Sequence, residues 1–160
     1  MSKKINLLET GNMLMAAQKI VLCCHVSPDG DTLGSALGLA RLLEQKGKEV
    51  TVFVDDDINK SLSFIPGVDK VQRPEAGVII EADLFVVVDA SSFDRVGICN
   101  EVVKAPVLLN IDHHISNTEF ADYLYLDAEA AAAGEIMCDL FEAMGWEYDE
   151  AIAVDFYTAI

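Results

Sequence analysis

Three short apolar runs, each leading directly into aspartate or histidine, constrain the fold of this chain more than any other feature. The first run covers residues 20–26, the second lies in "ADLFVVVDAS" and ends at Asp89, and the third lies in "APVLLNIDHH" and ends at Asp112. A short, continuous apolar run is typical of a strand that is buried on both faces. The chain therefore predicts several buried strands with polar residues at their carboxyl ends.

Segments with helical spacing alternate with these strands. After Thr32, the residues Leu33, Leu37 and Ala40 follow the i, i+4, i+7 spacing of a helix, and Gly47 fits just beyond its end. We expect further helices at 6–18, 61–65 and 130–144, and further strands at 50–54, 68–71 and in "YLYLD". This alternation predicts an α/β fold, a three-layer domain with a mainly parallel sheet flanked by helices.

Composition restricts the partners of the chain. Hydrophobic residues make up 52% of the sequence, which excludes a disordered chain. The net charge is −16, from 27 acidic and 11 basic residues, so the surface repels phosphate backbones and duplex DNA is not an expected partner. Bound metal ions would offset part of this charge, although general solubility explains most of the excess.

The cysteines and the N-terminal segment indicate the compartment. Cys23 and Cys24 are adjacent, Cys99 and Cys138 are isolated, and no C-x-x-C pair exists, so we expect neither disulfides nor a structural zinc site. Polar residues interrupt any signal-peptide core near the N-terminus, and no apolar run is long enough to span a bilayer. We therefore expect a cytoplasmic protein with reduced thiols and no membrane contact.

The polar residues at the strand ends are candidates for a metal site. In open α/β sheets, ligands bind beyond the carboxyl ends of the strands, so these groups could converge. Imidazole and carboxylate ligands together suit Mn²⁺, Co²⁺ or Zn²⁺. A pair of such ions can bind the attacking and leaving oxygens of a phosphoryl displacement and activate water. The candidates are His25, Asp29, Asp31, Asp89, Asp112, His113 and His114.

Each candidate also has a purely structural explanation. The Asp29-Gly30 pair could form only a turn, Asp31 could be only a helix N-cap, and Asp89 could cap the segment after its strand. His113 and His114 could be ordinary loop residues. Taken together these explanations are weaker, because every histidine of the chain lies beside aspartate at a predicted strand end.

The motifs "HVSPDGD", "VVVDAS" and "NIDHH" resemble the first three motifs of the DHH phosphoesterase family, and the resemblance runs from about Ile20 to the end of the chain. The motif spelling resembles most the branch of nanoRNA-degrading oligoribonucleases and 3'-phosphoadenosine 5'-phosphate phosphatases. The resemblance implies a metal-dependent phosphoesterase, an oligoribonuclease or exonuclease that acts on short oligonucleotides or nucleotides. The alternatives are a cyclic-dinucleotide phosphodiesterase, or a domain that binds nucleotide or metal without turnover. A pyrophosphatase is less expected, because its motif usually differs after the first aspartate.

The resemblance also implies a role for each metal ligand. His25 and Asp29 would bind one ion, Asp31 and His113 would bind the other, and Asp89 would bridge both. The implied cofactor is a pair of Mn²⁺ ions, with Co²⁺ or Mg²⁺ as alternatives.

The resemblance implies roles for two further residues that are not metal ligands. Asp112 would orient a histidine, and His114 would contact the scissile phosphate. The segment "AAAAGEI" loosely matches another family motif, but we interpret it as close helix packing through alanines.

The sequence departs from the family pattern at its end. Family members carry a further aspartate ligand soon after a segment like "FYTAI", and then a C-terminal domain that binds substrate. This chain stops at Ile160, so we expect residues 1–160 to be a truncated DHH catalytic domain, with the C-terminal substrate-binding domain absent. A homodimer is compatible with the sequence but not specified by it.

Overall fold

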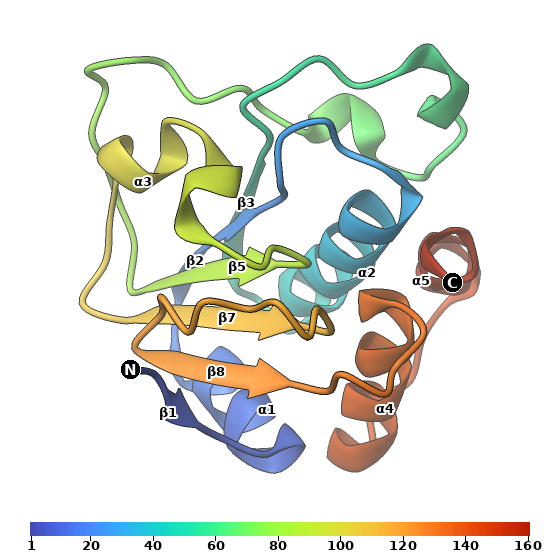
Figure 1. Cartoon of the computed structure of the whole chain (residues 1–160). Coiled ribbons are helices and arrows are strands. Elements are labelled where there is room, and N and C mark those ends of the chain that lie inside the picture. The colour runs from blue at the N-terminus through green and yellow to red at the C-terminus, as the bar shows by residue number, and fades with distance from the viewer.

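The computed structural model describes residues 1–160 and is built around one six-stranded sheet in the order β1-β8-β7-β5-β2-β3 (Figure 1). Every neighbouring pair in this sheet is parallel, which confirms the predicted α/β fold. The strands are β1 (Lys3–Lys4), β2 (Lys19–Cys23), β3 (Glu49–Phe53), β5 (Leu84–Val88), β7 (Leu108–Asp112) and β8 (Tyr123–Leu126). A separate two-stranded sheet joins β4 (Ile80–Glu81) and β6 (Val103–Lys104).

Helices cover the two faces of the sheet unequally. One face packs against α1 (Leu7–Ala16), α2 (Gly30–Gln45) and α4 (Ala133–Met144) in a core of 28 buried residues. The opposite face has a core of 11 buried residues under the short helix α3 (Cys99–Val102) and the 3₁₀ turn η3 (Phe93–Val96). The strands therefore bury both faces, as their continuous apolar sequences predict.

Helix α5 (Glu150–Ala159) forms an outer layer beside α2 and α4, and the sequence reading did not predict it (Figure 1). Two glycines of α2 allow its close approach. A Cβ added to Gly34 would overlap the carbonyl oxygen of Asp155, and a Cβ added to Gly38 would overlap the ring of Phe156. The contact buries the Asp155 carboxylate, whose Oδ2 lies 3.6 Å from Nε of Arg41.

Two predicted elements differ from the structure. Residues 68–71, predicted as a strand, instead form the 3₁₀ helix η2 (Val68–Lys70), because Gly67 has φ = 80° and turns the chain left-handed just before it. The strand-like pairing begins only afterwards, where the Gln72 N–H donates to the Val52 carbonyl. The predicted helix at 61–65 is the shorter 3₁₀ helix η1 (Lys60–Leu62).

The three motif-bearing strands are adjacent. Strand β5 lies between β2 and β7 and runs parallel to both, so the carboxyl ends of all three meet at one edge of the sheet (Figure 1). The polar groups at the three strand ends therefore converge, as expected from the sequence. None of the helices is both long and apolar enough to cross a bilayer.

Candidate metal centre

Asp89, the first residue after β5, is the point at which the three strand ends meet. Its carboxylate is 3% exposed, with Oδ2 lying 3.5 Å from Nε2 of His25 and Oδ1 lying 3.4 Å from Nε2 of His113. Oδ1 is buried without any hydrogen-bond partner. The backbone of Asp89 has φ = 59°, a left-handed conformation that is uncommon outside glycine and recurs at functional sites.

Both histidines beside Asp89 are oriented by backbone carbonyls. Nδ1 of His25 lies 2.8 Å from the carbonyl oxygen of Val26, and Nδ1 of His113 lies 3.2 Å from that of Ala130. A carbonyl oxygen only accepts, so each Nδ1 is the donor and each Nε2 is directed toward Asp89. Metal-binding histidines commonly donate their second ring N–H in this way.

The Asp29 carboxylate makes two kinds of contact at the start of α2, one with the helix backbone and one with His25. Its Oδ1 accepts hydrogen bonds of 3.1 Å from the backbone N–H groups of Asp31 and Thr32, so Asp29 is the N-cap of this helix. The same oxygen lies 3.7 Å from Nε2 of His25. The purely structural explanation of Asp31 as the N-cap is therefore wrong, because Asp29 fills that position.

Asp31 lies beside His113, whereas Asp29 lies beside His25. Oδ2 of Asp31 is 3.6 Å from Nε2 of His113. Its carboxylate accepts hydrogen bonds of 3.0 and 2.9 Å from the backbone N–H groups of Ala133 and Gly134, at the start of α4. The hydroxyl of Ser35 donates to it as well. The interpretation of "AAAAGEI" as packing alone is therefore incomplete, because this segment also fixes Asp31.

His114 and Asp112 form a second connected pair. Nδ1 of His114 lies 2.6 Å from Oδ1 of the fully buried Asp112, which leaves Nε2 of His114 free. Asn117 donates to Oδ2 of Asp112 at 2.6 Å and to the side-chain oxygen of Asn110 at 2.7 Å. This chain of hydrogen bonds holds the His114 ring in one orientation, while 41% of its side chain stays exposed.

The electrostatics of the cluster favour a bound cation. Burial alone lowers the pKa of His25, but hydrogen bonds to Asp29 and Asp89 outweigh it and raise that pKa to about 10. The His25 ring in turn lowers the pKa of Asp29 to about 2, whereas burial and the Asp89 charge raise the pKa of Asp31. The charges of Asp31 and Asp89 thus oppose each other, and a cation between them would relieve this repulsion.

The donor set fits a divalent metal. Ligand atoms of His25, Asp29 and Asp89 lie within 4.8 Å of one another, as do those of Asp89, His113 and His114. Asp89 belongs to both groups, and its unpartnered Oδ1 is a buried acceptor that a cation would satisfy. These groups could therefore bind metal.

Comparison with known proteins identifies the family. Residues 19–160 match the DHH family, N-terminal domain. The chain belongs to the DHH family.

The relatives of this DHH chain include bifunctional oligoribonuclease and PAP phosphatase NrnA of Thermus thermophilus, 34% identical over 144 residues that cover 88% of this chain and 42% of that protein. The protein of the same name from Bacillus subtilis is 28% identical over 144 residues, 88% of this chain and 44% of that protein. An exopolyphosphatase-related protein from Bacteroides fragilis superposes with a TM-score of 0.87 at 28% identity, covering 95% of this chain and 48% of that one. The chain therefore spans less than half the length of each.

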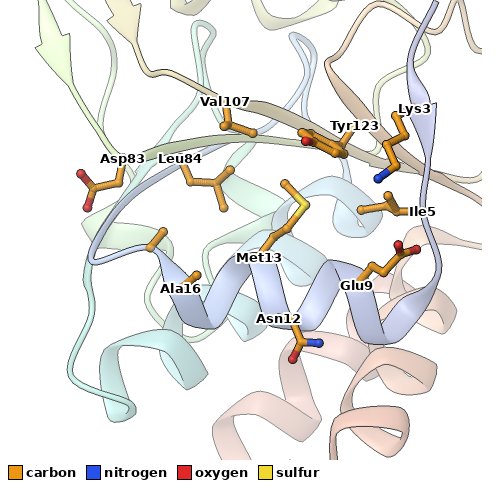
Figure 2. A pocket seen from close by; sticks show the side chains of 11 residues that line it. Lys3, Ile5, Glu9, Asn12, Met13, Ala16, Asp83, Leu84, Val107 and Tyr123 are labelled. Carbon is orange, nitrogen blue, oxygen red and sulfur yellow. The ribbon is translucent and has the colours of Figure 1, made fainter.

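A separate hollow of about 530 Å³ lies far from the DHH motifs, at the amino-terminal ends of the strands. Figure 2 shows Met13 of α1 directed at Leu84, Val107 and Tyr123 across this hollow, with Lys3 at one end. Its lining is mostly apolar and includes none of the seven candidate residues. It therefore offers no comparable chemistry.

Sequence reasoning missed the residues that support the DHH motifs. The Thr32 hydroxyl, on α2, accepts a hydrogen bond from the backbone N–H of His25 and donates one to the carbonyl oxygen of Val88. It therefore ties the start of α2 to the ends of β2 and β5. Asn110 was visible as a polar residue inside an apolar run, and this signal could have identified it. Asn117 gave no comparable signal, because its partners are set only by the fold.

Proposed function

We propose that this chain is the catalytic domain of a metal-dependent phosphoesterase that hydrolyses phosphate esters of short oligonucleotides or nucleotides. The observation that carries the proposal is the buried Asp89 carboxylate. Its two oxygens face Nε2 atoms of histidines from two different strand ends, and one of these oxygens has no hydrogen-bond partner. A carboxylate in this position is suited to bridge two cations.

In the proposal, Asp89 is shared between two metal sites. His25 and Asp29 complete the first site, and Asp31 and His113 contribute to the second, as their distances to one another support. Two divalent ions, Mn²⁺ by the family resemblance and the donor types, would activate a water molecule and neutralise phosphate charge. The chain's own part is to hold these donors through the carbonyl and N–H contacts described above.

His114 is assigned to the substrate phosphate. Asp112 accepts a hydrogen bond from Nδ1, so in the protonated imidazolium form the partly exposed Nε2–H can donate to a phosphate oxygen beside the cluster. A donor that is already oriented stabilises the charge that develops in the transition state without further reorganisation. Asp112 acts only through His114, because it is fully buried and already accepts two hydrogen bonds.

The names of the relatives support the proposed substrate class. The two NrnA proteins are named for oligoribonuclease and PAP phosphatase activity, and the proposal extends both to the protein to which this chain belongs. Such substrates occur inside cells, which agrees with the cytoplasmic location expected from the sequence. From the family resemblance we further propose that another aspartate ligand and a substrate-binding domain follow Ile160. The resemblance does not specify whether the protein is a homodimer.

The experiment compares the two ends of one strand. Asp89 follows β5 and Asp83 precedes it, so Asp89→Asn and Asp83→Asn make the same chemical change at opposite edges of the sheet. Each variant is assayed with Mn²⁺ against short RNA, 3'-phosphoadenosine 5'-phosphate, a cyclic dinucleotide and pyrophosphate, in this chain and in a chain continued past Ile160. We expect turnover of the first two substrates, slower in the 160-residue chain, and its loss only in Asp89→Asn.

Four results would contradict parts of the proposal. Undiminished turnover in Asp89→Asn would remove the bridging role. A preference for the cyclic dinucleotide would show that the protein is a cyclic-dinucleotide phosphodiesterase instead. If the continued chain binds Mn²⁺ at Asp89 but turns over no substrate, the domain binds its ligands without catalysis. Equal turnover in the short and the continued chain would show that nothing beyond Ile160 is needed.

A further inference from the structure

Arg95, on η3, is the one arginine of the chain that pairs with no carboxylate. Arg41 pairs with Asp155, and Arg73 pairs with Asp55 and Asp57. Arg95 instead contacts the candidate metal centre, with Nη2 lying 3.3 Å from Nδ1 of His25. In a chain with 27 acidic residues, a guanidinium left free of carboxylates beside a metal cluster is available to another anion.

Backbone hydrogen bonds fix the position of the Arg95 main chain. The carbonyl oxygen of Arg95 accepts the N–H of Val26 at 2.7 Å, and its own N–H donates to Ser92 at 3.2 Å. The first bond ties η3 to the first DHH motif, and the second closes the turn of η3 itself. They do not involve the guanidinium, so a substitution that alters only the side chain leaves the attachment of η3 in place.

The contact with His25 does not use the hydrogen-bonding capacity of Arg95. Nδ1 of His25 lies closer to the Val26 carbonyl, at 2.8 Å, and a carbonyl only accepts, so Nδ1 carries a hydrogen. An N–H group cannot accept a hydrogen bond from the guanidinium. Arg95 is exposed, so its guanidinium lies beside His25 with donors that face water and stay available to an anionic ligand.

The position of Arg95 also tells which phosphate it could reach. The nitrogens Nδ1 and Nε2 flank Cε1 and point away from each other, and Asp89 faces Nε2, whereas Arg95 faces Nδ1. The His25 ring thus stands between the guanidinium and the proposed metal sites. A phosphate at Arg95 is a neighbour of the phosphate that reacts and not the reacting group itself.

We propose that Arg95 binds a second phosphate of the substrate and so makes the site select molecules with two phosphates over molecules with one. This inference rests on the proposed function and deepens it. The selected class comprises nucleoside bisphosphates and oligonucleotides with a terminal phosphate. The planar guanidinium suits bidentate phosphate binding better than an ammonium group does.

The test measures a ratio that a merely structural role would not change. Binding of adenosine 3',5'-bisphosphate and of AMP to the Mn²⁺-loaded chain is measured by calorimetry for the parent, Arg95→Gln, Arg95→Lys and the control Arg73→Gln. We expect the parent and the control to prefer the bisphosphate. In Arg95→Gln the ratio of bisphosphate affinity to AMP affinity should fall by about ten- to hundredfold, because this is the typical contribution of a hydrogen bond to a charged group. In Arg95→Lys the ratio should fall less, because the ammonium group keeps the charge.

Each result decides the assignment. Equal affinity of the parent for both ligands, or no binding of either, overturns it. An equal loss of both ligands in Arg95→Gln overturns it too, because Arg95 would then act only by positioning His25. The kcat/KM ratio for a dinucleotide with and without a 5'-phosphate should change in parallel. If the parent shows the binding preference and Arg95→Gln loses it while no substrate is turned over, the proposed hydrolysis fails and the Arg95 site stands.

Discussion

Replacing Asp155 by asparagine tests the free-energy cost of a carboxylate buried between α2 and α5. Asp155 is fully buried, and neither of its oxygens has a hydrogen-bond partner. Its only ionic partner is Arg41, whose Nε lies 3.6 Å from Oδ2. Burial outweighs the attraction of Arg41 and raises the pKa of Asp155 from 3.8 to about 7.

The raised pKa gives the sign and the size of the effect. The folded chain holds the Asp155 proton up to about pH 7, and the unfolded chain releases it near pH 4, so ionisation of Asp155 lowers stability as the pH rises between these values. A difference of about three pH units, at about 1.4 kcal/mol per unit, sets an upper limit of about 4 kcal/mol above pH 7. Asparagine cannot ionise, so Asp155→Asn should avoid this loss.

Urea unfolding of the parent and the variant at a series of pH values measures the effect. The stability advantage of Asp155→Asn should grow by about 2 kcal/mol between about pH 5.5 and about pH 8. Asp149→Asn is the matched control on the same helix, because backbone N–H groups lower the pKa of that N-cap and removing its charge should not stabilise the chain. An advantage of Asp155→Asn that does not change with pH would refute the reasoning.

The remaining predictions concern the metal centre and the helix contact. Mn²⁺ at a hundred times its Kd should stabilise the parent by about 2.7 kcal/mol, and thermal unfolding should show this gain largely lost in Asp89→Asn but retained in Asp83→Asn. Gly38→Ala should destabilise the chain by about 1–3 kcal/mol in urea unfolding, because its Cβ would overlap the Phe156 ring. Asn117→Ala should lower kcat by about tenfold or more with little change in Mn²⁺ affinity. The substitution removes a hydrogen bond that holds the Asp112 carboxylate, so the His114 ring loses its fixed orientation.

The sheet and the residues that gather in the candidate metal centre could be predicted because their signals are local. A buried parallel strand reads as a continuous apolar run, and a polar residue at its carboxyl end is placed at one edge of the sheet by topology alone. This is why β2, β5 and β7, with Asp89 between His25 and His113, were found from the sequence.

Helix α5 was missed because its sequence reverses the usual pattern. It directs the ionisable Asp155 inward at 0% exposure, while Tyr157 and Val154 stay 86% and 37% exposed. Residues 68–71 were misread because the β-branched Val68 and Val71 favour a strand, whereas Gly67 sets a left-handed turn. Contacts such as that of Arg95 with His25 depend on the fold alone and leave no trace in a local pattern.

The meeting of three strand ends at Asp89 has a consequence for how this chain folds. Its candidate ligands come from distant parts of the sequence, so the unfolded chain has no site of comparable affinity, and the cluster exists only once β2, β5 and β7 have paired. An ion that binds this late contributes nothing to nucleation. It should leave the refolding rate unchanged and slow unfolding, so metal supply would set the lifetime of the folded chain and not the speed at which it forms.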